Sequence, residues 1–264
     1  MKDLQGKTVW LTGASSGIGE ALAYELAGRG CHLILSARNE QELRRVQSGC
    51  RSPDSHTVIP LDVSLYGDLE EAAEDAWAKY GPIDVLINNA GISQRYTALE
   101  GSLDLDAKIM DTNFFGTVAL TRPLVKKMVA RKAGHVVVIS SVLGLYGVQT
   151  RTAYAASKHA LRGYFSSLRN EIVGSQVVIT NIYPGYVMTN VSRNALKADG
   201  SAYGKVDAGH AAGILPDVCA KKIVRAIEAD KAEVVIAKGK EWLGVVMTRF
   251  TPGLFRYISS RSNV

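Results

Sequence analysis

The stretch TGASSGIG at residues 12–19 decides the fold class of this 264-residue chain. It follows the aliphatic segment Lys7–Leu11, which is typical of a buried strand, and it leads directly into the helical pattern of Gly17–Arg29. Glycines at such a turn let the backbone bend sharply, so that a pyrophosphate can lie against the N–H groups of the first helical turn. The spacing is GxxxGxG rather than GxGxxG, and an ordinary glycine-rich turn is the alternative. The residues expected to contact a dinucleotide here are Gly13, Ser15, Ser16, Gly17, Ile18 and Gly19.

Strand and helix patterns keep alternating after this turn. Further strands are predicted over Cys31–Leu35, Thr57–Leu61, Ile83–Ile87, His135–Ser140, Gln176–Tyr183 and Glu233–Ile236. Helices are predicted over Gln41–Ser48, Leu65–Tyr80, Leu99–Arg131, Thr152–Val173 and Pro216–Ile227. Because continuous apolar strands alternate with helices, the sequence predicts an α/β fold, a Rossmann-type doubly wound parallel sheet of about seven strands with helices on both faces.

The length and texture of the chain favour one domain over residues 1–264. At roughly 150 residues per domain the length allows one large domain or two small ones, and no linker interrupts the pattern. Residues 186–214 are rich in Gly, Ala, Ser and Asn and lack periodicity, so we interpret them as an excursion over a substrate pocket. Pro252-Gly253 breaks the tail of residues 240–264, which we expect to cover that pocket or a partner subunit rather than to lie on a membrane surface.

Composition excludes several classes of protein. With 47% hydrophobic and 21% charged residues, the chain is neither disordered nor a coiled coil. The net charge of +6 is spread along the sequence, so we expect no nucleic-acid partner. The three cysteines and five histidines lack ligand spacing, which argues against a metal site and favours a reducing compartment. Without an apolar leader or a long uninterrupted apolar run, we expect a cytoplasmic protein with no transmembrane segment.

Polar residues at the ends of three predicted strands extend the dinucleotide site. Arg38 follows the second strand, where an acidic residue would otherwise bind the adenine-ribose 2′-hydroxyl. A guanidinium suits a 2′-phosphate, so we expect NADP(H) to be preferred over NAD(H), although a plain surface arginine is the alternative. Asp62 and Val63 after the third strand, and Asn88-Asn89-Ala90-Gly91 after the fourth, would line the adenosine site. Asx residues are also common turn formers.

A serine, a tyrosine and a lysine indicate the chemistry. Tyr154 and Lys158 share one face of a predicted helix, and Ser141 follows the fifth strand. The pKa of a free tyrosine is about 10, and a lysine cation and an oxidised nicotinamide beside Tyr154 would lower it. Ser141 would then donate a hydrogen bond to the substrate oxygen, while Tyr154 transfers a proton and the cofactor a hydride.

Together, TGxxxGIG at 12–19, NNAG at 88–91, Asn113, Ser141, YxxxK at 154–158 and Pro184-Gly185 resemble the motifs of the short-chain dehydrogenase/reductase family over nearly the whole chain. The resemblance implies a catalytic tetrad of Asn113, Ser141, Tyr154 and Lys158. In that family the main-chain carbonyl matching Asn113 holds a proton-relay water, and Lys158 and Thr189 match contacts to the nicotinamide riboside. It further implies that Pro184, Gly185 and Val187 line the nicotinamide site, and that the helix carrying Tyr154 packs against a second subunit in a homodimer or homotetramer.

Residues 184–204 and 251–255 resemble one branch of this family in particular, the dehydrogenase/reductase member 7B-like branch. Animal members of the branch carry an N-terminal membrane anchor. Because this chain starts six residues before its first predicted strand, the resemblance implies a cytoplasmic version without the anchor.

The sequence therefore predicts an NADP(H)-dependent oxidoreductase that interconverts a carbonyl and a secondary alcohol on an apolar small-molecule substrate. The expected substrate contacts are Ser141, Tyr154, Gln149 and Tyr186. Two alternatives remain open. One is a sensor or scaffold that binds NADP(H) without turnover, and the other is a nucleotide-sugar epimerase, which usually carries a larger substrate domain.

Overall fold

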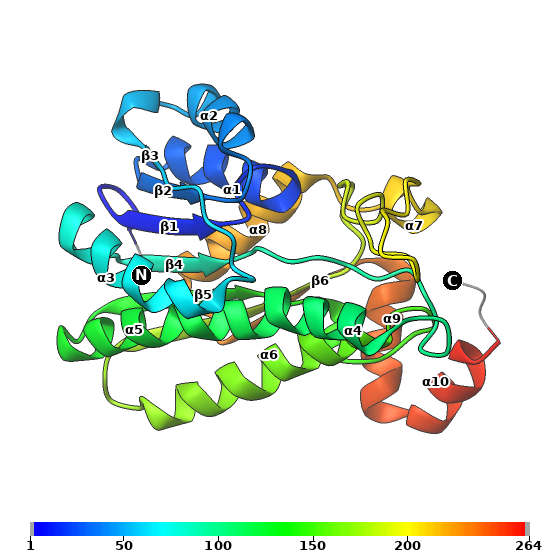
Figure 1. Ribbon diagram of the computed structural model, residues 1–264. Helices are drawn as coiled ribbons and strands as arrows, with labels where there is room; N and C mark the ends of the chain where they lie inside the picture. Colours follow the sequence, from blue (N-terminus) through cyan, green and yellow to red (C-terminus); the bar gives the residue numbers. More distant parts are fainter. Residues whose placement is uncertain (1–2, 262–264) are drawn as a thin grey trace.

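Seven parallel strands form one sheet in the order β3-β2-β1-β4-β5-β6-β7 (Figure 1). The computed structural model describes residues 3–261. The strands are β1 (Thr8–Thr12), β2 (His32–Ser36), β3 (Thr57–Val58), β4 (Val85–Asn88), β5 (Gly134–Ile139), β6 (Val177–Pro184) and β7 (Glu233–Ile236). The strand order reverses between β1 and β4, and ligands of such sheets bind outside the carboxyl ends of the strands at this point. The predicted fold class is confirmed.

Helices cover both faces of the sheet. Their bounds are α1 (Gly17–Gly28), α2 (Glu40–Gly49), α3 (Leu69–Tyr80), α4 (Leu103–Met110), α5 (Gly116–Ala130), α6 (Thr152–Glu171), α7 (Ala208–Ala211), α8 (Pro216–Glu228), α9 (Gly239–Phe250) and α10 (Pro252–Ser259). Helices α1, α2 and α8 pack on one face, and α3, α5 and α6 pack on the other (Figure 1). Helices α9 and α10 lie beyond the carboxyl ends of the strands, and the chain breaks between them at Pro252 as predicted.

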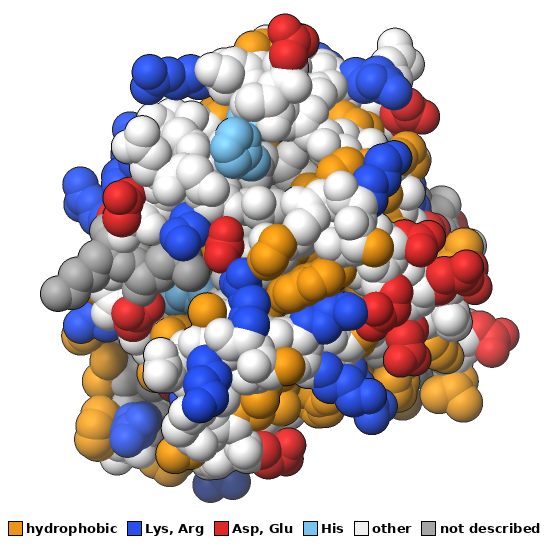
Figure 2. All heavy atoms as spheres, turned by 90° about the vertical axis from the view of Figure 1, so that its left-hand side faces the viewer, with side chains coloured by type: hydrophobic (Ala, Val, Ile, Leu, Met, Phe, Trp, Pro, Cys, Tyr) orange, Lys and Arg blue, Asp and Glu red, His pale blue; other side chains and the backbone are white. Residues whose placement is uncertain are grey.

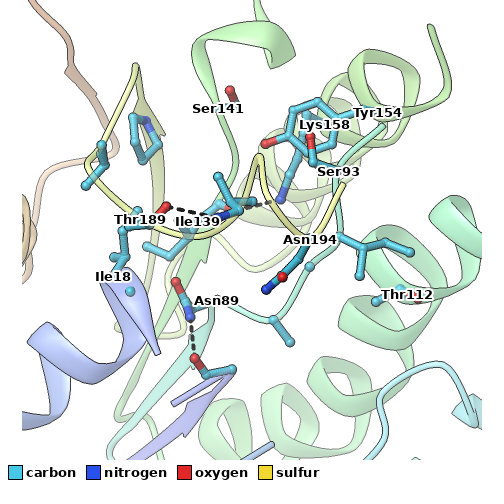
Figure 3. A pocket seen from close by; sticks show the side chains of 18 of the residues that line it. Ile18, Asn89, Ser93, Thr112, Ile139, Ser141, Tyr154, Lys158, Thr189 and Asn194 are labelled. Atoms are coloured by element: carbon cyan, nitrogen blue, oxygen red, sulfur yellow. Dashed lines mark hydrogen bonds between the residues drawn. The ribbon is translucent and has the colours of Figure 1, made fainter. Parts of the chain in front are cut away.

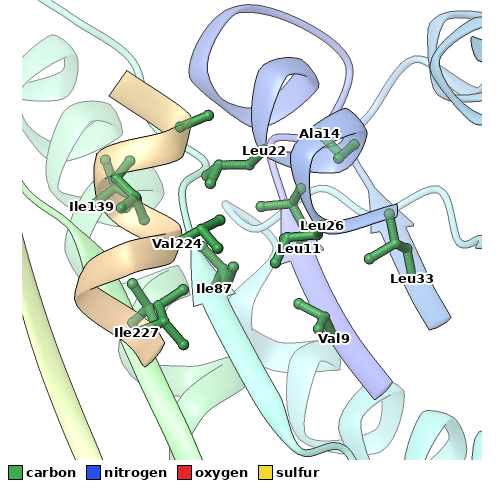
Figure 4. Packing of buried hydrophobic residues seen from close by; sticks show 14 of the residues in the cluster. Val9, Leu11, Ala14, Leu22, Leu26, Leu33, Ile87, Ile139, Val224 and Ile227 are labelled. Atoms are coloured by element: carbon green, nitrogen blue, oxygen red, sulfur yellow. The ribbon is translucent and has the colours of Figure 1, made fainter. Parts of the chain in front are cut away.

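Alternate residues of each central strand divide between the two cores. Val9 and Leu11 of β1 point to the side of α1 and α8, whereas Trp10 packs on the opposite side. In Figure 4, Leu22 and Leu26 of α1 meet the strand residues between them and α8. Because both faces are buried, the strands read as continuous apolar runs with no polar alternation. Two such cores fix the carboxyl ends of the strands, where the candidate site lies.

Two predicted elements differ from those observed. The third strand is limited to β3, although the N–H groups of Ile59 and Leu61 still donate to carbonyls of the β2 segment. Pro60 lies between these two donors at the edge of the sheet, where its missing N–H group would point away from β2. The predicted helix over 99–131 begins only at Leu103, where the Ser102 side chain accepts a hydrogen bond from Leu105 N–H, and a π-helical turn divides it at Asp111–Phe115.

The surface of the molecule shows mixed charge. Figure 2 views the side where strands β1 and β4 begin, opposite the candidate site, and basic and acidic side chains stand next to each other there. On the outer side of α5 and α6, ring contacts join Tyr66, Phe115, Phe114 and Tyr164, with Phe115 45% exposed. Pairing of subunits over this side stays a prediction. No helix within residues 3–261 combines the length and hydrophobicity needed to cross a bilayer.

Candidate active site

A cavity of about 500 Å³ lies outside the carboxyl ends of the strands. Most residues predicted to bind cofactor or substrate line it together. They are Gly13, Ser15, Ser16, Gly17, Ile18, Arg38, Asp62, Val63, Asn89, Ala90, Gly91, Ser141, Tyr154, Lys158, Pro184, Gly185, Tyr186, Val187 and Thr189. The glycine turn and Arg38 come from the N-terminal half of the sheet, whereas Ser141, Tyr154 and Tyr186 follow β5 and β6. The cavity therefore crosses the point where the strand order reverses.

The glycine turn between β1 and α1 is closely packed. Gly13 and Gly17 have φ values of +64° and +60°, a region that favours glycine. A Cβ on Gly13 would lie 2.8 Å from Ala90 Cα, so this position has no room for a side chain. Gly19 was expected to contact the cofactor, but it does not line the cavity. Its missing Cβ would lie 2.1 Å from the Gly13 carbonyl oxygen, so Gly19 lets the helix approach the turn.

The two asparagines at the carboxyl end of β4, Asn88 and Asn89, make different contacts. Asn89 donates hydrogen bonds from Nδ2 to the carbonyl oxygens of Thr12 (3.1 Å) and Gly13 (3.0 Å), which ties β4 to the glycine turn (Figure 3). Asn88 was expected to wall the adenosine site, and this was wrong. It is buried and donates to Thr121 Oγ1 at 2.9 Å. Successive strand residues point to opposite faces of a sheet, which turns Asn88 into the core.

Arg38 and Asp62 lie at the end of the cavity formed by β2 and the segment after β3. The Arg38 side chain is exposed, and within residues 3–261 it forms no ion pair. Asp62 Oδ1 accepts hydrogen bonds from the N–H and hydroxyl groups of Ser64 at 2.9 and 2.8 Å. Arg38 thus presents a positive charge at the mouth of this end.

Tyr154, Lys158 and Ser141 meet at the other end (Figure 3). Lys158 Nζ lies 5.7 Å from the centre of the Tyr154 ring and donates a hydrogen bond to the Ile139 carbonyl at 3.0 Å. Burial lowers the pKa of Lys158 to about 8. The Ser141 side chain accepts a hydrogen bond from Leu143 N–H at 3.1 Å, which fixes the loop after β5.

The electrostatics of Tyr154 differ from expectation. The sequence led us to expect a lowered pKa, caused by Lys158 and the oxidised cofactor. In the protein alone, burial raises the pKa of Tyr154, and a hydrogen bond with Ser141 and the charge of Arg151 oppose that rise. Desolvation of the phenolate therefore outweighs the neighbouring charges, and the tyrosine keeps its proton at neutral pH.

Asn113 occupies the π-helical turn and does not line the cavity. Its side chain accepts a hydrogen bond from Ile92 N–H (2.8 Å) and donates to Ile92 O and Ser157 Oγ, both at 3.0 Å. The main-chain carbonyl of Asn113 accepts a hydrogen bond from the Thr117 hydroxyl at 2.9 Å. π-helical turns are frequent at functional sites because they displace one residue of a helix. Here the turn brings Asn113 between the β4 loop and α6.

Gln94 and Arg151 lie beside Tyr154, and the sequence did not single out Arg151 for the site. Gln94 is fully buried; its Oε1 accepts from Tyr154 N–H at 3.1 Å, and its Nε2 donates to Thr152 Oγ1 at 3.0 Å. Arg151 is 3% exposed and lines the cavity. The sequence could have indicated Arg151, because residues three apart share a helix face and Arg151 precedes Tyr154 by three.

Gln149 was predicted to contact the substrate. It is exposed and lies beside Ser260 instead.

Residues 7–200 match the family model described as short chain dehydrogenase. The chain belongs to the short-chain dehydrogenase family. This short-chain dehydrogenase is 39% identical to a dehydrogenase/reductase SDR family protein 7-like of Drosophila melanogaster. The match covers 99% of this chain and 82% of the relative. It is 40% identical to dehydrogenase/reductase SDR family member 7B of Bos taurus, over 98% and 82% of the two chains.

A solved structure is similar across the whole short-chain dehydrogenase fold. The crystal structure of a short-chain dehydrogenase from Streptomyces avermitilis superposes with a TM-score of 0.81 at 26% identity, covering 98% of this chain and 99% of that one. The resemblance to the family, and to its member 7B-like branch, is thereby confirmed. Membership identifies the protein as an oxidoreductase of a family that uses a nicotinamide cofactor.

Proposed function

We propose that this short-chain dehydrogenase uses NADP(H) to interconvert a carbonyl and a secondary alcohol on a small molecule with an apolar body. One observation carries the proposal. Tyr154, Ser141 and Lys158 line one end of a single cavity, and the glycine turn and Arg38 line the other. A reacting carbon bound near Tyr154 would thus share the cavity with the reactive end of a dinucleotide. Apolar side chains beside Tyr154, including Leu143 and Val148, suit an apolar substrate body.

The residues at the glycine turn fit the cofactor. Gly13 and Gly17 leave the backbone bare of side chains at the start of α1, where a pyrophosphate binds N–H groups. The exposed guanidinium of Arg38 at the cavity suits the 2′-phosphate of NADP(H). When bound, the nicotinamide supplies or accepts the hydride.

Tyr154 and Ser141 would handle the substrate oxygen. Because burial raises the pKa of Tyr154, the phenol holds its proton and can donate it as the oxygen becomes an alkoxide. The Ser141 hydroxyl would stabilise the developing charge on the same oxygen. Lys158, next to the phenol, would favour the phenolate that is left behind.

A panel of carbonyl compounds tests the proposal through the loss of NADPH fluorescence. We expect turnover by the natural protein and a loss of at least about 100-fold with Tyr154→Phe, because proton transfer contributes this much. NADPH affinity should stay unchanged, and Tyr66→Phe, at an exposed tyrosine outside the cavity, should behave as the natural protein. Failure to bind either nicotinamide cofactor would overturn the proposal. Binding without turnover of any compound would favour a sensor, and turnover without net cofactor oxidation would favour an epimerase.

A further inference from the structure

The cavity wall near Tyr154 contains a buried ionic cluster that the proposed chemistry does not use. Arg151, three residues before Tyr154, lines the cavity. Its Nη1 donates to Ser93 Oγ at 2.9 Å and to the Gln94 carbonyl, and its Nη2 donates to Asp207 Oδ2 at 3.1 Å. The same Asp207 oxygen accepts a hydrogen bond from Arg95 Nη2. The side chains of all three charged residues are at most 12% exposed.

The charges in this cluster do not balance. In the part of the chain that the structure describes, Arg95 and Arg151 both pair with the carboxylate of Asp207, and these three side chains together carry a net positive charge. A guanidinium does not lose its proton in a protein, even though burial and the charge of Arg95 lower the pKa of Arg151. A buried charge without a full counter-charge is costly. Binding of an anion at this place would remove part of that cost.

A purely structural role explains Arg95 better than Arg151. Asp207 belongs to the 186–214 excursion, and one arginine is enough to fasten its carboxylate. Arg95 does so and does not line the cavity, as far as residues 3–261 show. Arg151 also holds Asp207, yet it lines the cavity together with Ser93 and Tyr154. The positive charge therefore borders the space where a substrate would lie.

Polar groups beside Arg151 can complete an anion site. The Ser93 hydroxyl accepts its hydrogen bond from Arg151, and its own proton is available to a ligand oxygen. Asn194, from the excursion, lines the same cavity, and Figure 3 shows it with Ser93 and Tyr154. Hydrogen bonds to a charged group are stronger than those between neutral groups, so such a site can select one substrate class over another.

We propose that Arg151 and Ser93 bind an anionic group, a carboxylate or a phosphate, on the carbonyl substrate and so direct its carbonyl toward Tyr154. The inference rests on the proposed function and narrows its substrate to an apolar body with one anionic end. Because Arg151 lies one helical turn from Tyr154, the anion and the reacting carbonyl would belong to the same small molecule.

Three ketones with the same carbon chain test the inference: a keto acid, its methyl ester and the matching keto phosphate. We expect kcat/KM to be at least roughly tenfold higher for one of the anionic ketones than for the ester. The ketone that is turned over best tells whether the site prefers a carboxylate or a phosphate. Arg151→Gln should reduce the preference in kcat/KM for that ketone over the ester roughly tenfold, and Arg151→Lys should restore part of the preference. Arg193→Gln removes an exposed charge from the same excursion and should not change the preference.

The outcomes separate this inference from the proposed function. Equal turnover of ester and anionic ketones overturns the inference and leaves the function intact. If no ketone is turned over, or if Arg151→Gln does not fold, the natural protein loaded with NADPH is titrated with the saturated acid, the saturated alkyl phosphate and the saturated methyl ester. Tighter binding of either anion than of the ester, followed by cofactor fluorescence, supports the anion site. Equal binding of all three overturns it.

Discussion

The two ends of the cavity are built in different ways. At the glycine end, the turn comes from eight consecutive residues, 12–19, and close backbone packing fixes its shape. At the end near Tyr154, Asp207 meets Arg151 and Arg95, which stand 56 and 112 residues away in the chain. The first end is a local motif that a sequence displays directly. The second exists only after distant segments have packed, so a sequence does not display it.

The largest expected effect breaks the glycine end. In Gly19→Ala the new Cβ would lie 2.1 Å from the backbone oxygen of Gly13, which cannot move without opening the turn. We expect the free energy of unfolding to fall by about 3 kcal/mol and cofactor binding to be lost. Urea unfolding and NADPH titration measure both. Gly28→Ala in the same helix is the control, since no atom lies within 4 Å of its new Cβ. A Gly19→Ala protein with normal cofactor affinity would contradict the close packing.

A second change affects only the end near Tyr154. Gln94→Ala removes the acceptor of Tyr154 N–H and the donor to Thr152. We expect kcat to fall roughly tenfold, because the tyrosine loses its fixed position, and stability to fall by about 2 kcal/mol. Cofactor affinity should not change. Gln149→Ala, at an exposed glutamine, should leave kcat as it is. The comparison of the two ends fails if cofactor affinity falls together with kcat.

Lys158 lies at the end near Tyr154, and the pH dependence of stability reports on its charge. Burial lowers its pKa from 10.5 to about 8, so between these values the unfolded chain binds more protons than the folded one. The free energy of unfolding contributed by Lys158 therefore rises with pH in this window. From pH 8 to 9.5 the natural protein should gain about 1.5 kcal/mol relative to Lys158→Met, as measured by urea unfolding.

That experiment has a built-in control. Burial raises the pKa of the three cysteine thiols, Cys31, Cys50 and Cys219, which makes stability fall as the pH rises above about 8.5. Both proteins contain these thiols, so their effect cancels in the difference. Parallel stability curves for the two proteins would mean that Lys158 keeps an ordinary pKa.

The smallest expected effect concerns the exposed edge of the glycine end. Arg38→Asp should weaken NADPH binding roughly tenfold and leave NADH binding nearly unchanged, because only NADPH carries the 2′-phosphate. Stability should stay within about 0.5 kcal/mol, since Arg38 is exposed. Titration of both cofactors by fluorescence gives the ratio. An equal loss of affinity for both cofactors would mean that Arg38 acts through its charge in general and does not bind the 2′-phosphate.

The same division separates the features that can be predicted from the sequence from those that cannot. Strands such as β1 were predicted within one residue, because a doubly covered parallel strand is apolar throughout. The shared face of Tyr154 and Lys158 follows from helical periodicity alone. Asn88 was misplaced because its direction depends on the register of β4. Gln149 was misplaced because its surroundings depend on how α10 packs.

Other features were beyond prediction for a physical reason. The π-helical turn at Asp111–Phe115 depends on tertiary contacts of Asn113 with Ile92 and Ser157, which no local pattern encodes. The raised pKa of Tyr154 depends on how much water its surroundings exclude. Both quantities are properties of the assembled structure.

Besides the ion pairs of Asp207, main-chain hydrogen bonds join the excursion to the rest of the fold. Arg95 N–H donates to the Leu196 carbonyl, and Leu196 N–H donates to the Ser93 carbonyl. Every residue type except proline offers these donors. Exposed side chains between 186 and 214, such as Met188, can therefore be exchanged while the loop keeps its course. Evolution, or a directed library, can give this scaffold new substrates without first having to rebuild its pocket wall.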